Sequence, residues 1–156
     1  MFGPKKIDYR IPRQSSRLWR SLLTSFANEF VINPNAGNIK ETMYKIGYRF
    51  ATQSALPTCN SLDEFKIAMN SVWQDLDWGW VDLEETPSSL RIIHHQSTNA
   101  SLINDVFGDQ TKVWGPAILE GAYQKWLSAM GAGESLKVTQ SEPTDEFGTT
   151  EYQLKA

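Results

Sequence analysis

The chain of 156 residues lacks several features that would place it in a large functional class. It has a single cysteine, Cys59, which excludes an intrachain disulfide and a cysteine-based metal cluster. It also has no apolar run of about 20 residues and no charged start followed by an apolar segment, so nothing in it marks a membrane span or secretory export. These absences favour a cytoplasmic protein without direct membrane insertion.

Common enzyme signatures are missing as well. The sequence contains no phosphate-binding loop, dinucleotide fingerprint, nucleophile elbow or zinc-ligand spacing. The only two histidines, His94 and His95, are adjacent, and adjacent side chains on a strand point to opposite faces, so they would not ligate one ion. We therefore expect no metal, no cofactor and no catalytic residue.

A group of carboxylates leaves one enzymatic alternative open, a small carbohydrate hydrolase. Two acidic residues on one face of an expected strand could act as acid and base on a glycosidic bond. A half-buried strand needs polar residues on its wet face in any case, and neighbours two apart lie only about 7 Å from each other. We favour the solvated-face interpretation for the whole group, which comprises Asp75, Asp77, Asp82, Glu84 and Glu85.

What the chain does have is aromatic side chains and an uneven charge. Six Trp and seven Phe are more than a small core usually holds, which favours burial of aromatic surface between copies. Six basic residues among the first twenty stand against Asp8 alone, so this part carries +5 and the remainder −8 of the net charge of −3. The basic residues are spread out and the pI is about 5.4, which argues against nucleic-acid binding.

Periodicity predicts an α+β fold. Residues 1–14, with two prolines, are interpreted as an extended arm that orders when something binds it, and residues 15–156 as one oligomerising domain. Three helices are expected at about 15–32, at 38–54, and after a capping box of Ser61 and Glu64. Their expected apolar stripes are Leu18, Leu22, Phe26 and Phe30; Ile39, Met43, Ile46 and Phe50; and Leu62, Phe65, Met69, Val72, Trp73 and Leu76.

The second half is expected to supply an antiparallel sheet on which the helices pack. A change to period two predicts a β-hairpin around Pro87-Ser88, and residues 97–110 are interpreted as a long loop. A fourth helix should have Pro116 in its first turn and end at Gly131, before two strands at 136–140 and 147–154.

Four residues are candidates for an oligomer interface or for close packing: Trp80, Trp114, Ala117 and Gly121. Ala117 and Gly121 form a small-xxx-small pair that would let a second helix or sheet approach closely. The tryptophans of Trp78-Gly79-Trp80 could stack on sugar rings, because a pyranose presents an apolar C–H face. A core or subunit contact is the favoured interpretation for them.

Three segments resemble the D-subunit family of bacterial cellulose synthase. Residues 113–126 resemble a helix of that family that carries Trp, Pro, Leu-Glu-Gly, Tyr and Trp in the same order. Residues 78–84 and 89–94 resemble its hairpin, with Trp-Gly before the first strand and Ser-Leu-Arg-Ile-x-His in the second. Lys5-Lys6 followed by Asp8 and Tyr9 is similar to its N-terminal tip. The chain departs from the family in its longer 97–110 loop and its acidic 141–151 stretch.

The resemblance implies a non-enzymatic accessory of cellulose synthase. Its dimers would close into a ring-like octamer that guides nascent β-1,4-glucan chains for export, with Phe2, Lys5, Lys6 and Tyr9 lining the passages. The implied partners are other copies, glucan, the synthase complex and a proline-rich accessory protein, with stacking into filaments. The implied place is the cytoplasm near the inner-membrane synthase, with the periplasm as the alternative.

The order of helices and strands is also similar to that of trafficking-complex and four-vinyl-reductase-like domains. That resemblance implies an alternative function, the binding of a small apolar ligand.

Overall fold

The computed structural model describes residues 21–30, 32–33, 38–96 and 111–156. These residues form four helices and one four-stranded sheet, which confirms the predicted α+β class. The arm expected at residues 1–14 and the loop expected at 97–110 lie outside them. In chain order the elements are a helix at 21–30, α2 (Ile39–Gln53), α3 (Leu62–Asp75), β1 (Trp80–Glu85), β2 (Leu90–His95), α5 (Thr111–Ala129), β3 (Lys137–Glu142) and β4 (Thr150–Lys155).

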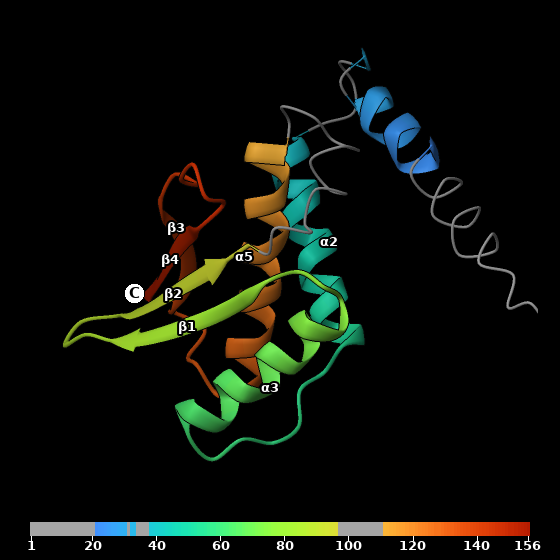
Figure 1. The fold of residues 1–156 in the computed structure, drawn as a ribbon. Helices are drawn as coiled ribbons and strands as arrows, with labels where there is room; N and C mark the ends of the chain where they lie inside the picture. The colour runs from blue at the N-terminus through green and yellow to red at the C-terminus, as the bar shows by residue number, and fades with distance from the viewer. Residues whose placement is uncertain (1–20, 31, 34–37, 97–110) are drawn as a thin grey trace, which may run out of the picture.

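The sheet has the strand order β1-β2-β4-β3, and all its pairings are antiparallel. β1 and β2 form the predicted hairpin, in which the Thr86 N–H donates to the Ser89 carbonyl at 2.9 Å across the turn. Figure 1 shows α2, α3 and α5 gathered on one side of the sheet. Side chains at alternate strand positions therefore face either these helices or the opposite, outer side.

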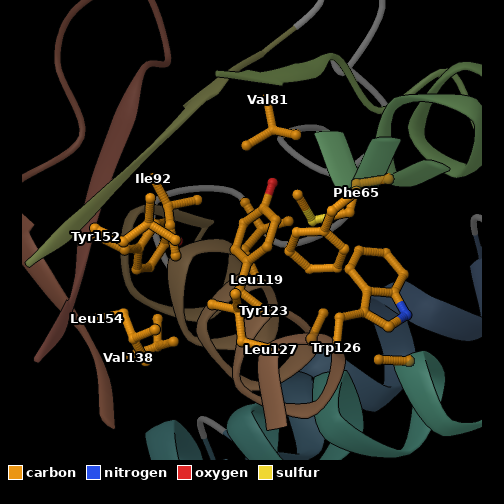
Figure 2. Packing of buried hydrophobic residues seen from close by; sticks show 14 of the residues in the cluster. Phe65, Val81, Ile92, Leu119, Tyr123, Trp126, Leu127, Val138, Tyr152 and Leu154 are labelled. Atoms are coloured by element: carbon orange, nitrogen blue, oxygen red, sulfur yellow. The ribbon is translucent and has the colours of Figure 1, made fainter. Parts of the chain in front are cut away.

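The main core lies between the sheet, α3 and α5, where side chains from all three meet (Figure 2). Trp73 of α3 is fully buried at its centre. Its ring centroid lies 5.1 to 5.9 Å from those of Phe50, Trp78, His94, Tyr123 and Trp126. Aromatic burial of this kind explains part of the tryptophan excess within one chain.

The helices α2 and α5 pack against each other through two glycines. A Cβ added to Gly47 would lie 1.7 Å from the Ile118 carbonyl oxygen, and one added to Gly121 would lie 2.0 Å from the Tyr44 carbonyl oxygen. The two backbones are therefore in direct contact. The buried face of α2 is formed by Met43, Gly47 and Ala51.

Among the described residues, four positions that were predicted to lie in buried apolar stripes are exposed, so these predictions were wrong. Ile46 is exposed, because the close approach of α5 selects the face of α2 that carries small residues. Leu22 and Phe26 are 43% and 57% exposed, and the residues of that helix that pack in the second core cluster are Ala27 and Phe30. Leu76 is exposed because it caps α3 after the last helical turn.

The start of the fourth helix was also predicted wrongly. α5 begins at Thr111, so Pro116 lies inside the helix and not in its first turn. A proline there lacks the N–H that would bond to the preceding turn, which is why sequence rules place it at a helix start. Its carbonyl accepts a hydrogen bond from the Tyr152 hydroxyl at 2.8 Å, which ties this turn of α5 to β4.

Candidate functional site

The segment Trp78-Gly79-Trp80 leads into the β1–β2 hairpin, and its two indoles point in different directions. Trp78 packs edge-on against Trp73 in the core, with 5.5 Å between ring centroids, whereas Trp80 is 47% exposed. Gly79 has a φ of +82°, and a Cβ there would lie 1.9 Å from the His95 carbonyl oxygen. Only glycine fits where the backbone of residue 79 approaches that of His95 so closely. The Trp-Gly pair therefore fixes the position at which Trp80 reaches the surface.

Trp80, His95 and Asp82 form a connected group on the outer face. The ring of His95 stacks on that of Trp80, with centroids 5.0 Å apart and an interplanar angle of 20°. Its Nε2 lies 3.2 Å from the Asp82 Oδ2. An exposed indole beside polar groups can cover the apolar face of a sugar ring while the neighbours bond to its hydroxyls.

Two carboxylates of the hydrolase alternative contact basic side chains on this face. Asp82 pairs with His95, and Glu84 pairs with Arg91. The Arg91 guanidinium also donates to Glu151 of β4 at 2.9 Å, so it crosslinks three strands. These contacts support the solvated-face interpretation of Asp82 and Glu84.

The second histidine, His94, faces the opposite way and is buried in the core. Its Nε2 lies 2.8 Å from the Trp78 carbonyl oxygen, and its Nδ1 lies 2.5 Å from the Tyr123 hydroxyl. Since a carbonyl can only accept, Nε2 carries the proton and Nδ1 accepts from Tyr123. Burial lowers the pKa of His94 to about 4, so the ring is neutral at pH 7.

The candidate interface residues lie in three different places. Trp114 and Ala117 are buried in the second core cluster, where Trp114 meets the Phe30 ring edge-on at 6.2 Å. Gly121 lies against α2 of the same chain, and Trp80 alone of the four is at the surface. The candidate glucan residues Phe2, Lys5, Lys6 and Tyr9 lie outside the described residues.

Sequence reasoning missed the polar side chains that join helices to strands. Asn70 of α3 accepts from the Val81 N–H at 2.7 Å and donates to the Val81 carbonyl at 3.0 Å. Gln124 of α5 accepts from the Val138 N–H at 2.8 Å. The sequence signal for these bonds is a polar residue beside the buried stripe of an amphipathic helix. A polar side chain in that position usually has a hydrogen-bond partner.

Among the described residues, surface cavities flank the helices. One, of about 340 Å³, lies between the end of α2 and the second half of α5, and its walls include Leu56, Trp126 and Met130. The other, of about 360 Å³, lies between the first turns of α3 and strand β1.

The described ranges hold neither a metal centre nor a membrane span. No three His, Cys, Asp or Glu side chains there are grouped so that they could hold a metal ion. None of the helices among those residues has the length and apolarity required to cross a membrane.

Comparison with known proteins gives one consistent result. A family model for the D subunit of cellulose synthase matches residues 5–153. The chain is similar to a cellulose synthase operon protein D of Komagataeibacter xylinus, with 27% identity over 72% of each chain. It is also 23% identical, over 72% of each chain, to the protein of that name from Komagataeibacter sucrofermentans.

Proposed function

Since this chain belongs to the D-subunit family of cellulose synthase, we propose that it is a non-catalytic subunit that assembles into a ring-like octamer and guides nascent β-1,4-glucan chains. The observation that carries the proposal is the family match over residues 5–153, which includes most of the basic arm as well as the body. In this role the protein orders the glucan chains for export and crystallisation.

The arm supplies the groups for glucan in this proposal. Lys5 and Lys6 donate hydrogen bonds to sugar hydroxyls, and Phe2 and Tyr9 offer rings for stacking. Each contact must be weak, because a passage that bound its polymer tightly would stall it. Trp80 is a further exposed ring for transient stacking on the outside of the body.

The outer face of the sheet supports the part of the proposal that makes the protein non-catalytic. A glycosidase needs one carboxyl group that can hold a proton and another that is free to attack or to activate water. Asp82 and Glu84 are instead paired with His95 and Arg91.

The partners in this proposal are other copies, glucan and the cellulose synthase complex, with a proline-rich accessory protein and filament stacking as further contacts. The proposed place is the cytoplasmic side of the inner-membrane synthase, with the periplasm as the alternative.

The first experiment measures solution mass by light scattering and cellohexaose binding by calorimetry. We expect a mass near eight chains and weak binding that falls about tenfold in a Lys5→Ala/Lys6→Ala variant, since two donors are lost. Lys137→Ala/Lys155→Ala is the matched control, because it removes two exposed lysines from the body and should keep binding. A monomer, or equal loss in both variants, would contradict the proposal.

The cavity at the end of α2 favours one alternative, a domain that binds a small apolar ligand. Its walls combine Leu56, Trp126 and Met130 with the Lys125 side chain, which would suit an apolar molecule with an anionic end. A monomer that carries such a molecule in native mass spectrometry would favour this alternative over the ring.

A further inference from the structure

Strand β1 is an edge of the sheet, and only part of this edge is covered. The Val81 N–H and carbonyl point away from β2 and bond to the Asn70 side chain of α3. Backbone groups point to the same side at every second residue of a strand, so those of Leu83 and Glu85 also point away from β2. Among the described residues, nothing pairs with these four backbone groups. They form an open edge that could accept another strand.

A groove lies directly beside this open edge. It has a volume of about 360 Å³, and one wall is Leu83 and Glu85 of β1. The other wall is the start of α3, with Ser61, Leu62, Asp63 and Lys66. An added strand would lie about 4.8 Å from β1, in the space that this groove provides.

One segment of this same sequence has the pattern of a strand that could fill the groove. Between Pro4 and Pro12, the apolar Ile7, Tyr9 and Ile11 alternate with polar residues. This is period two with β-branched and aromatic side chains, over a length typical of strands. A proline at each end cannot donate to a ladder, so the pairing would stop at both ends.

Charge favours the same occupant. The segment 5–11 has Lys5, Lys6 and Arg10 against Asp8, whereas Asp63 and Glu85 outnumber Lys66 in the groove. A net positive strand therefore meets a net negative groove. Its apolar face can pack on Leu62 and Leu83, which are both partly buried against the core.

The N-terminal helix indicates that the occupant comes from a second copy. It leaves Leu22 and Phe26 uncovered by its own chain, as an element that contacts a neighbouring copy would. Its Ala27 packs near the start of α2, with Met43 and Trp114. Figure 1 shows the start of α3, which forms one wall of the groove, toward the end of α2 that lies away from the N-terminal helix, and α2 is about 22 Å long, so a second copy is the favoured source of the occupant.

We propose that residues 5–11 of one copy add as a strand to the open β1 edge of a second copy. The inference rests on the self-assembly in the proposed function and adds a specific contact to it. This arrangement replaces the glucan contacts proposed above for Lys5 and Tyr9, which share the groove-facing side of the strand with Ile7 and Ile11, and it leaves Phe2 and Lys6 available to glucan.

A photo-crosslinking experiment on the full chain tests the contact. A benzophenone amino acid replaces Tyr9, and the irradiated protein is separated on a denaturing gel before the crosslinked peptides are identified by mass spectrometry. We expect a two-chain band in which residue 9 is joined to residues 61–66 or 80–85.

Two substitutions separate backbone pairing from charge. Glu85→Pro removes an outward N–H that β2 does not use, and it should lower the crosslink yield at least about tenfold. Glu85→Ala keeps that N–H and should keep most of the yield. Circular dichroism and thermal unfolding of both variants show whether the hairpin is intact.

The outcomes are distinct. A crosslink within one chain, at another surface or not at all, in a protein of oligomeric mass, would overturn the inference and leave the assembly standing. Equal yields from Glu85→Pro and unmodified protein would also overturn strand pairing. A monomeric mass would overturn the assembly and the inference together.

Discussion

At the scale of single residues, two adjacent histidines have opposite environments because the strand alternates. His95 is stacked on the exposed Trp80, whereas His94 is bonded to Tyr123 and Trp78 in the core. The buried ring is held neutral, since protonation would place a charge in an aromatic core. The same ring links β2 to α5 through the Tyr123 hydroxyl.

This burial makes stability depend on pH. The pKa of His94 is about 4 in the folded protein and about 6.5 when unfolded, so the unfolded chain binds more protons between these values. The free energy of unfolding should therefore fall as the pH is lowered from about 6.5 to 4, by up to about 3 kcal/mol. Urea unfolding at a series of pH values measures this slope.

A comparison of variants isolates the contribution of the buried ring. His94→Gln should flatten the slope, and His95→Gln should keep most of it, because burial is the largest cause of the low pKa of His94 and the smaller Coulombic effect of His95 is all that is removed. The comparison also removes the effect of Glu120, whose pKa is raised by burial and which is present in all three proteins. An unchanged slope in His94→Gln would show that another group causes the pH dependence.

At the scale of elements, the contact between α2 and α5 depends on the absence of side chains at Gly47 and Gly121. In an unconstrained helix, replacing glycine by alanine stabilises by about 1 kcal/mol. Here we expect the opposite sign for Gly47→Ala, a loss of at least about 2 kcal/mol, because the new Cβ would meet the Ile118 backbone. Chemical denaturation measures the difference.

Gly133→Ala provides the matched control for this substitution. The nearest atom to a Cβ at Gly133 is the Ser135 hydroxyl oxygen at 3.8 Å, which is ordinary contact, so stability should change by less than about 0.5 kcal/mol. If Gly47→Ala proved as stable as Gly133→Ala, the helices would not be in backbone contact.

The elements that sequence reasoning predicted well are those with local signals. The Ser61 hydroxyl accepts from the Glu64 N–H at 3.1 Å, as the capping pattern predicted, and the hairpin follows its period-two pattern. Such signals lie within a few residues of one another, so no knowledge of tertiary structure is needed to read them.

The predictions that were wrong concern residues whose contacts are far away in sequence. Pro116 was placed at a helix start because its interior position makes sense only with Tyr152 bonded to its carbonyl. Ile46 belongs to a regular apolar stripe, yet the close approach of α5 at Gly47 decides which face of α2 is buried. The candidate site was predictable only at Trp78-Gly79-Trp80, because the position of Asn70 beside a buried stripe does not indicate that its partner is the Val81 backbone.

At the scale of the whole molecule, the separation of charge between arm and body should make assembly sensitive to salt. The first twenty residues carry +5 and the rest −8, so in the proposed oligomer the arms and bodies of different copies would attract one another. The screening length falls from about 10 Å at 0.1 M salt to 3 Å at 1 M. We expect the concentration at which the oligomer half-dissociates to rise about tenfold over this range, as measured by light scattering.

Neutralising the arm provides the control for that prediction. A Lys5→Gln/Lys6→Gln/Arg10→Gln variant should assemble less at low salt and respond less to added salt. A mass that stays constant with salt in both proteins would show that the arm's charge plays no part in assembly.

The strand order also has a consequence for how the protein is made. β4 lies between β2 and β3, although it is the last of the four strands to be synthesised. On the ribosome, the β1–β2 hairpin and β3 have no shared neighbour until residues 150–155 have emerged. The sheet is therefore completed in a late step, and we expect a nascent chain to expose the unpaired edge of β2 to chaperones until residues 150–155 are inserted.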